Sequence, residues 1–134
     1  MNQSLNKKNY GPTLDEWRPL AEQGFSGAQY MLGLLYQQGQ SVPQNYQTAV
    51  KWYKLAAEQG HAKAQFLLGV MYEQGQGISQ NIIYAYMWFN IAASQGNKDA
   101  AKNRDFLAKT MPPAQVEEAQ ELSAECKKKR DKGC

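Results

Sequence analysis

The sequence predicts an all-α fold in which helical hairpins follow one another as a repeat array. Residues 25–60 align with residues 61–96 at an offset of 36 positions, and the alignment needs no gap. Within each copy, apolar residues recur at the three- and four-residue spacing of a helix rather than at the alternate spacing of a strand. Glycines separate these apolar runs at matching places, as is typical of helix ends. Repeats of this length build solenoids, in which each unit buries its apolar face against its neighbours.

Small, aromatic and capping residues carry the alignment. Identical residues meet at Ala28/Ala64, Gln29/Gln65, Leu32/Leu68, Gly33/Gly69, Tyr36/Tyr72, Asn45/Asn81, Trp52/Trp88 and Gly60/Gly96. Gly33 and Gly69 fall inside predicted helices, where glycine costs about 1 kcal/mol relative to alanine. We therefore expect a neighbouring helix to approach closely at both glycines.

Each copy is predicted to contain two helices. In the first copy the first helix spans roughly Ala28–Gln38 and ends at Gly39. Asn45 is placed to cap the second helix, because its side chain can accept a hydrogen bond from an unpaired backbone N–H. The second helix then continues to Gly60. The matching positions of the second copy are Gly75, Asn81 and Gly96.

The regions outside the two copies are predicted to be partial units of the same domain. The predicted order is a flexible tail (1–12), a partial unit (13–24), two repeats (25–60 and 61–96), a degenerate half unit (97–109), a capping helix (112–130) and a tail (131–134), within a single repeat domain spanning 13–134. Pro19 is unfavourable inside the first of these helices. Pro113 suits the first position of the last helix, which would cover the final apolar face of the array.

These residues resemble the Sel-one-like repeat family, a relative of the tetratricopeptide repeats. The resemblance rests on AQYMLGLLYQQGQSVPQNYQTAVKWYKLAAEQG and AQFLLGVMYEQGQGISQNIIYAYMWFNIAASQG, and it covers about residues 14–109. It implies a right-handed α-α superhelix whose first helices line a concave face. It also implies a non-enzymatic scaffold that binds a protein or peptide. Ser41 departs from the second copy, which has Gly77 at that place.

The resemblance also predicts a binding surface on the first helices. If the array follows tetratricopeptide geometry, positions i, i+4 and i+7 of each first helix line one groove, apolar inside with a polar rim. The predicted binding residues are Tyr30, Leu34, Gln37, Phe66, Val70, Glu73, Lys102 and Phe106, and Lys109 completes the third row. Such a groove suits an extended peptide or a partner helix. Alternatively, Tyr30 and Phe66 simply pack between adjacent first helices, as in a wide apolar stripe.

Candidate catalytic residues are few. His61 is the single histidine, and we expect it to be an exposed turn residue, since the sequence places no acid or nucleophile beside it. Ser4 begins an S-x-x-K pattern, but it lies in a polar tail and no K-T-G follows. Some cysteine-rich relatives have been linked to β-lactam binding or hydrolysis. A hydrolase of β-lactams or cell-wall fragments is therefore the alternative function, although this chain lacks the cysteine pairs that those relatives carry within their repeats.

Composition narrows the classes of partner. The net charge of +3 is too small to indicate a nucleic acid, and no apolar run approaches the ~20 residues of a membrane-spanning helix. One histidine and two terminal cysteines do not suggest a metal site, and we expect no cofactor. The acidic residues near the C-terminus are interpreted as a solvated helix face rather than as paired catalytic carboxylates. These residues are Glu117, Glu118, Glu121 and Glu125.

Cellular compartment and assembly stay open at this level. Cys126 and Cys134 could form a disulfide if the chain turns back between them. A disulfide would favour a periplasmic or secreted protein from which a signal peptide had been removed, and the cytoplasm is the alternative. The incomplete N-terminal unit could stack on a second copy, so the sequence allows a monomer or a weak homo-oligomer through the array ends.

Overall fold

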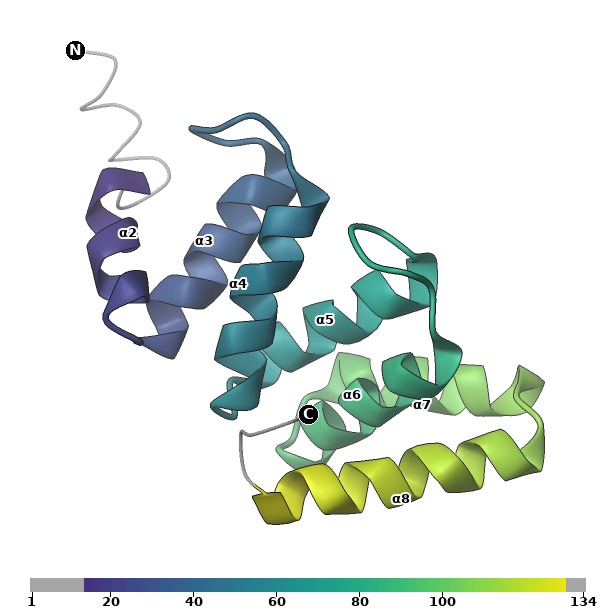
Figure 1. Cartoon of the computed structure of the whole chain (residues 1–134). Coiled ribbons are helices and arrows are strands. Elements are labelled where there is room, and N and C mark those ends of the chain that lie inside the picture. The colour runs from purple at the N-terminus through teal and green to yellow at the C-terminus, as the bar shows by residue number, and fades with distance from the viewer. Residues whose placement is uncertain (1–13, 130–134) are drawn as a thin grey trace.

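The structure, a computed structural model, describes residues 14–129, and this part of the chain is helical without strands. Its helices are α2 (Leu14–Glu22), α3 (Ser26–Gln38), α4 (Tyr46–Glu58), α5 (Ala62–Gln74), α6 (Ile82–Ser94), α7 (Lys98–Thr110) and α8 (Pro113–Lys129). They form a right-handed superhelical solenoid, with α2 and α3 at one end and α8 at the other (Figure 1). The predicted all-α array of hairpins is therefore confirmed.

The first helices of the three units have the same length and the same start. α3, α5 and α7 each contain 13 residues. The residues before them have nearly equal backbone angles, with φ/ψ of −72°/118° at Phe25, −73°/108° at His61 and −76°/109° at Asn97. α3 starts at Ser26, two residues earlier than the sequence predicts. Equivalent positions on α3, α5 and α7 can therefore be compared directly.

The second helices begin with matched asparagine caps. Asn45 and Asn81 share φ −152° and ψ 102°, and their side chains accept hydrogen bonds from the N–H groups of Thr48 and Tyr84, each at 3.0 Å. Such caps satisfy N–H groups that have no partner within the helix. The predicted role of Asn45 and Asn81 is confirmed.

Close packing inside each hairpin depends on the two mid-helix glycines. A Cβ atom on Gly33 would collide with the ring of Tyr53, and one on Gly69 would collide with the ring of Phe89. Tyr53 and Phe89 are equivalent residues of α4 and α6, and both are fully buried. The expected close approach is therefore confirmed, and an aromatic ring rather than a backbone fills the space at each glycine.

The buried residues form one large core and one small cluster. The large core runs from α4 to α8 and includes Trp88 and Tyr72. The small cluster joins α2 to the first hairpin, where Trp17 and Trp52 pack against the buried Ala21, Ala28, Leu32 and Leu35. Pro19 lies inside α2, so the helix tolerates it despite its missing N–H.

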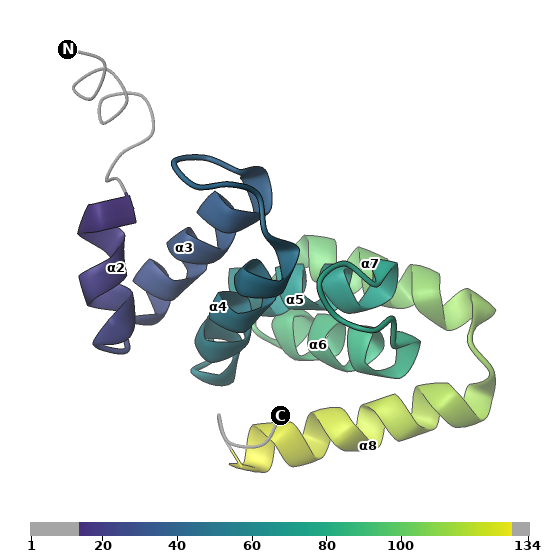
Figure 2. The same cartoon turned by 45° about the horizontal axis from the view of Figure 1, so that its top comes forward.

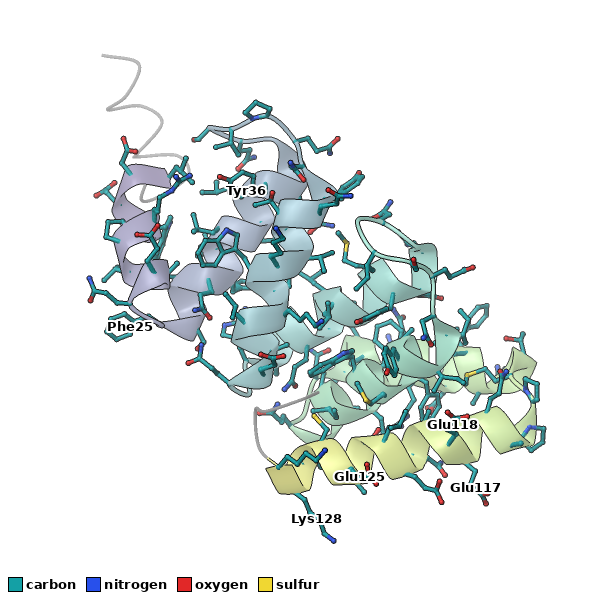
Figure 3. The ribbon with its side chains drawn as sticks, in the orientation of Figure 1. Phe25, Tyr36, Glu117, Glu118, Glu125 and Lys128 are labelled. Carbon is teal, nitrogen blue, oxygen red and sulfur yellow. The ribbon has the colours of Figure 1, made fainter. Side chains whose placement is uncertain are left out.

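The last helix covers the array at α6. Figures 1 and 2 both show α8 running beside α6. Ala119 and Ser123 are buried at this contact; the Ser123 hydroxyl donates to the Ala119 carbonyl at 2.8 Å, and it lies 3.4 Å from the carbonyl of Met87. The four glutamates of α8 are exposed, and this agrees with a solvated face. Figure 3 labels three of them, Glu117, Glu118 and Glu125.

Some sequence-based expectations fall outside the described range. They concern the tails 1–12 and 131–134, together with Ser4 and Cys134. Between residues 14 and 129, no helix combines the length and hydropathy needed to cross a bilayer.

Candidate functional site

The predicted binding residues occupy equivalent rows on α3, α5 and α7. Tyr30, Leu34, Gln37, Phe66, Val70 and Glu73 are half-buried, whereas Lys102 and Phe106 are exposed. Because the three helices start and end at equivalent places, the rows project from equivalent positions in the three units. We call these nine positions, including Lys109, the first-helix rows. Their use as one binding groove stays a prediction.

Tyr30 lies where the first unit meets the second. Its ring stacks on His61 at a centroid distance of 4.7 Å and an angle of 28°, and it lies 6.3 Å from the ring of Tyr53. Burial raises the pKa of Tyr30, and burial followed by the proximity of Tyr30 raises the pKa of Tyr53. Both phenols therefore stay neutral at physiological pH and act as hydrogen-bonding and apolar groups.

Phe66 occupies the matching place in the second unit. Its ring centroid lies 5.8 Å from that of Phe89, in a tilted arrangement that aromatic pairs favour. Tyr30 and Phe66 each pack partly against the main core, yet each keeps part of its ring accessible. Packing between helices and lining a binding surface are therefore compatible roles for Tyr30 and Phe66, because each ring contacts the core and is also partly exposed.

The third position of each row changes from unit to unit. The Gln37 side-chain oxygen accepts a hydrogen bond from the Tyr53 hydroxyl. Glu73 is the equivalent residue in the second unit, where Phe89 replaces Tyr53 and has no hydroxyl to donate. Burial raises the pKa of Glu73. The polar edge of the rows is therefore a neutral amide on α3 and a carboxyl group of raised pKa on α5.

The third row, on α7, is the most exposed. Phe106 has 64% of its surface accessible, and Lys102 and Lys109 flank it along the helix. Arg104 is on another side of α7, where it bonds to Asp105 at 3.0 Å and to Asn90 at 3.1 Å. An exposed aromatic ring between two cations distinguishes this row from the apolar rows on α3 and α5.

His61 differs from the sequence-based expectation of an exposed turn residue. It is half-buried, its Nδ1 accepts the N–H of Ala64 at 3.2 Å, and it caps α5. Burial, with a smaller effect of Lys63, lowers the pKa of His61. The expectation was wrong because spacing alone does not show that a histidine at this turn can replace the asparagine cap seen at Asn97.

Two buried glutamines connect successive units, a role that the repeat alignment alone did not reveal. The Gln29 side chain donates to the Ala21 carbonyl at 3.1 Å and accepts from Gln59 at 2.8 Å. Gln65 repeats both bonds one unit later, to the Ala57 carbonyl at 3.0 Å and from Gln95 at 2.7 Å. Each glutamine thus links three helices across the junction between units. Their identity at the 36-residue offset was the available signal.

A pocket of about 440 Å³ lies away from the first-helix rows. It is lined by residues at the C-terminal ends of α4, α6 and α8, among them Glu58, Gln95, Ile91 and Cys126. None of the predicted binding residues lines it, and no pattern in the residues indicates it. Its walls include Gln65 and Gln95, which belong to the inter-unit hydrogen bonds.

The described residues do not assemble a metal site, because no three His, Cys, Asp or Glu side chains between 14 and 129 are grouped suitably. Cys126 is half-buried on α8. Its predicted disulfide partner, Cys134, lies outside the described residues, so that bond stays a prediction.

A family model described as the Sel1 repeat matches residues 26–61 and again residues 62–97. Among solved structures, the chain is similar to c5321, a protective antigen present in uropathogenic Escherichia coli strains and displaying an SLR fold. That match has 29% identity and a TM-score of 0.85, over 97% of this chain and 29% of c5321.

A Sel1 repeat protein from Oxalobacter formigenes is also similar, with 45% identity and a TM-score of 0.62, over 63% of this chain and 35% of that protein. The chain thus spans about a third of the length of these two solved relatives. No curated protein matches it.

Proposed function

Because this chain belongs to the Sel1 repeat family, whose repeats generally mediate protein–protein interaction, we propose that it is a non-enzymatic scaffold that holds a peptide segment along its first-helix rows. The observation that carries this proposal is the set of equivalent positions on α3, α5 and α7. They combine half-buried rings with a strongly exposed Phe106.

The contacts within and between units suit the scaffold to this role, because they favour one arrangement of the helices before a ligand binds. Gln29 and Gln65 fix adjacent units through paired hydrogen bonds, and Gly33 and Gly69 seat rings tightly within each hairpin. A preorganised surface loses little conformational freedom on binding, so more of the contact energy contributes to affinity. Apolar ligand side chains would contribute about 25 cal/mol per Å² of apolar surface removed from water.

The proposal can be tested with a phage-displayed library of random short peptides. Peptides enriched on the wild-type protein are synthesised with a fluorescent label, and their affinity is measured by anisotropy. Phe106→Ala should weaken binding about tenfold or more, since aromatic residues dominate the energetics of such contacts. The melting temperature should hardly change, because the ring is already 64% exposed.

Phe25→Ala is the matched control. Phe25 is 58% exposed but precedes α3 at the turn after α2, outside the first-helix rows (Figure 3). Binding should be unaffected by this substitution. Equal loss in both variants, or no enriched peptide at all, would contradict the proposal.

Substitutions of Tyr30 and Phe66 test binding less directly than a substitution of Phe106. Both rings also contact the core, so their replacement by alanine should lower stability as well as affinity. Binding should be compared only at a temperature where circular dichroism shows that each variant is folded.

The hydrolase alternative gains no support from the geometry of His61. Its Nδ1 accepts the Ala64 N–H, and its ring stacks on Tyr30. A chromogenic β-lactam incubated with the pure protein is the discriminating assay, with His61→Asn beside the wild type. Turnover that disappears in the variant would favour the hydrolase over the scaffold.

A further inference from the structure

Charge changes along the first-helix rows. The row on α3 ends in the neutral Gln37, and the row on α5 ends in Glu73, whose pKa is raised by burial. The row on α7 begins with Lys102 and ends with Lys109. A ligand that follows all three rows would therefore meet a mainly apolar surface with one carboxyl group, at Glu73, before it meets the two lysines of α7.

The two lysines on α7 are available to a ligand. Both are exposed, and within residues 14–129 neither side chain takes part in an ion pair or a hydrogen bond. They lie at i and i+7 of one helix, with Phe106 at i+4, so all three side chains project from the same face. Two cations and one aromatic ring on one face form a compact site for an acidic side chain next to an apolar one.

Other charges on α7 do not cancel this site. Asp105 bonds to Arg104 at 3.0 Å. Asp99 lies three residues before Lys102, and Asp105 lies three residues after Lys102 and four before Lys109, so these carboxylates offset part of the charge of both lysines. α7 still contains four basic residues and only two acidic ones, so the helix keeps a positive balance. Glu73, on the neighbouring first helix, would repel an acidic ligand side chain placed over α5. The anionic part of a ligand is therefore directed to α7.

We propose that the bound segment is a peptide with apolar residues at one end and acidic side chains at the other, the apolar end lying over Tyr30 and Phe66 and the acidic end over Lys102 and Lys109. The inference rests on the proposed function, because it uses the same surface. It adds the chemistry of the partner and the direction in which the partner lies. Acidic side chains would gain affinity and orientation from the lysines, while the apolar residues would supply most of the contact area.

A peptide fits this surface better than a nucleic acid. Only two cations lie on the rows, and Phe106 is the one ring of the rows that lies between them, whereas Tyr30 and Phe66 lie on α3 and α5. Binding of single-stranded nucleic acid needs a continuous cationic groove in which stacking rings are interleaved.

The test compares the peptides enriched by two proteins from one random library. The wild type should enrich peptides that carry aspartate or glutamate on one side of an apolar stretch. The Lys102→Glu/Lys109→Glu variant should lose this acidic bias. Wild-type-selected peptides should bind the variant about tenfold more weakly at low salt, and the difference should shrink as salt is added.

Lys51→Glu/Lys128→Glu is the matched control, since it changes the net charge equally. Lys51 is exposed on the second helix α4, and Lys128 is exposed on α8 (Figure 3). This variant should enrich the same acidic peptides as the wild type. Circular dichroism checks that both variants are folded.

The outcomes separate the two proposals. Enriched peptides that lack an acidic bias, or keep it after the reversal on α7, overturn the inference and leave the scaffold proposal standing. Displacement of a bound peptide by an unstructured oligothymidylate as readily as by unlabelled peptide also overturns it, in favour of a general anion site. Failure to enrich any peptide overturns the scaffold proposal and the inference together.

Discussion

At the scale of single residues, two glycine positions show different reasons for having no side chain. At Gly33 an aromatic ring occupies the place of a Cβ atom, so packing requires glycine there. Gly77 has φ +72°, and a Cβ there would also collide with the Tyr46 carbonyl of the preceding unit. Ser41 has nearly the same φ, 70°, at the equivalent place, which shows that the loop keeps its shape when the residue is not glycine.

The packing requirement at Gly33 predicts a clear difference between two glycines of α3. Gly33→Ala should destabilise the fold by about 1–3 kcal/mol, because the added methyl group displaces the buried ring of Tyr53. Gly27→Ala should instead stabilise it by about 0.5–1 kcal/mol, since no atom lies within 4 Å of the new Cβ and alanine favours the helix. Urea unfolding followed by circular dichroism measures both. Equal effects of the two substitutions would contradict the close contact.

The residue types predicted many of these caps and close contacts. They did not predict those that depend on a side chain from another unit. The cap formed by Asn45 was predictable because a helix start needs a hydrogen-bond acceptor. The close contact at Gly33 was predictable because glycine destabilises a helix interior unless packing requires it. The cap formed by His61 was missed, because a histidine accepts a hydrogen bond only through an unprotonated nitrogen of suitable orientation. That orientation depends on the stacked ring of Tyr30, which comes from the preceding unit.

At the scale of elements, the junction between the first two units depends on His61. Its pKa is lowered, so between that pKa and the unfolded value of about 6.5 the unfolded chain binds more protons than the folded chain. This contribution to stability is complete above the unfolded pKa and is lost as the pH falls toward the folded pKa. Protonation also removes the acceptor that caps α5.

His61→Asn tests this pH dependence, because Asn97 shows that asparagine caps the equivalent helix, accepting the Ala100 N–H at 2.8 Å. The wild type should lose more stability than the variant when the pH is lowered from neutral toward 5. Glu73, whose pKa is raised, changes stability in the opposite direction, but it is present in both proteins and cancels in the comparison. Urea midpoints measured across this range give the difference. Parallel curves would show that His61 does not titrate between the two states.

The positions of the helices were predictable from the sequence, but the way in which the helices pack against one another was only partly predictable. Apolar spacing and glycine stops placed α3 to within two residues, since both signals are local. Pro19 inside α2 was not expected, because its local cost is outweighed by packing of Trp17 and Ala21 in the small cluster. The pocket at the ends of α4, α6 and α8 could not be inferred, because it depends on the angle at which α8 crosses α6.

At the scale of the whole molecule, an exact 36-residue offset was enough to predict a solenoid. Each unit repeats the same caps, the same ring-on-glycine contact and the same glutamine bonds, so the superhelix follows from one junction used twice. The third unit departs from this pattern: α7 has Ala101 in place of the glutamine, and α8 packs on α6. The row on α7 is therefore the one in which an aromatic side chain stays mostly exposed.

The central claim is that partners bind along the first helices, and amide NMR of the labelled protein tests it most directly. Titration with an enriched peptide should shift resonances in the first-helix rows, strongest around Phe66 and Phe106, and leave the outer face of α8 unchanged. Shifts confined to α4, α6 and α8, or to the pocket at their C-terminal ends, would contradict the account.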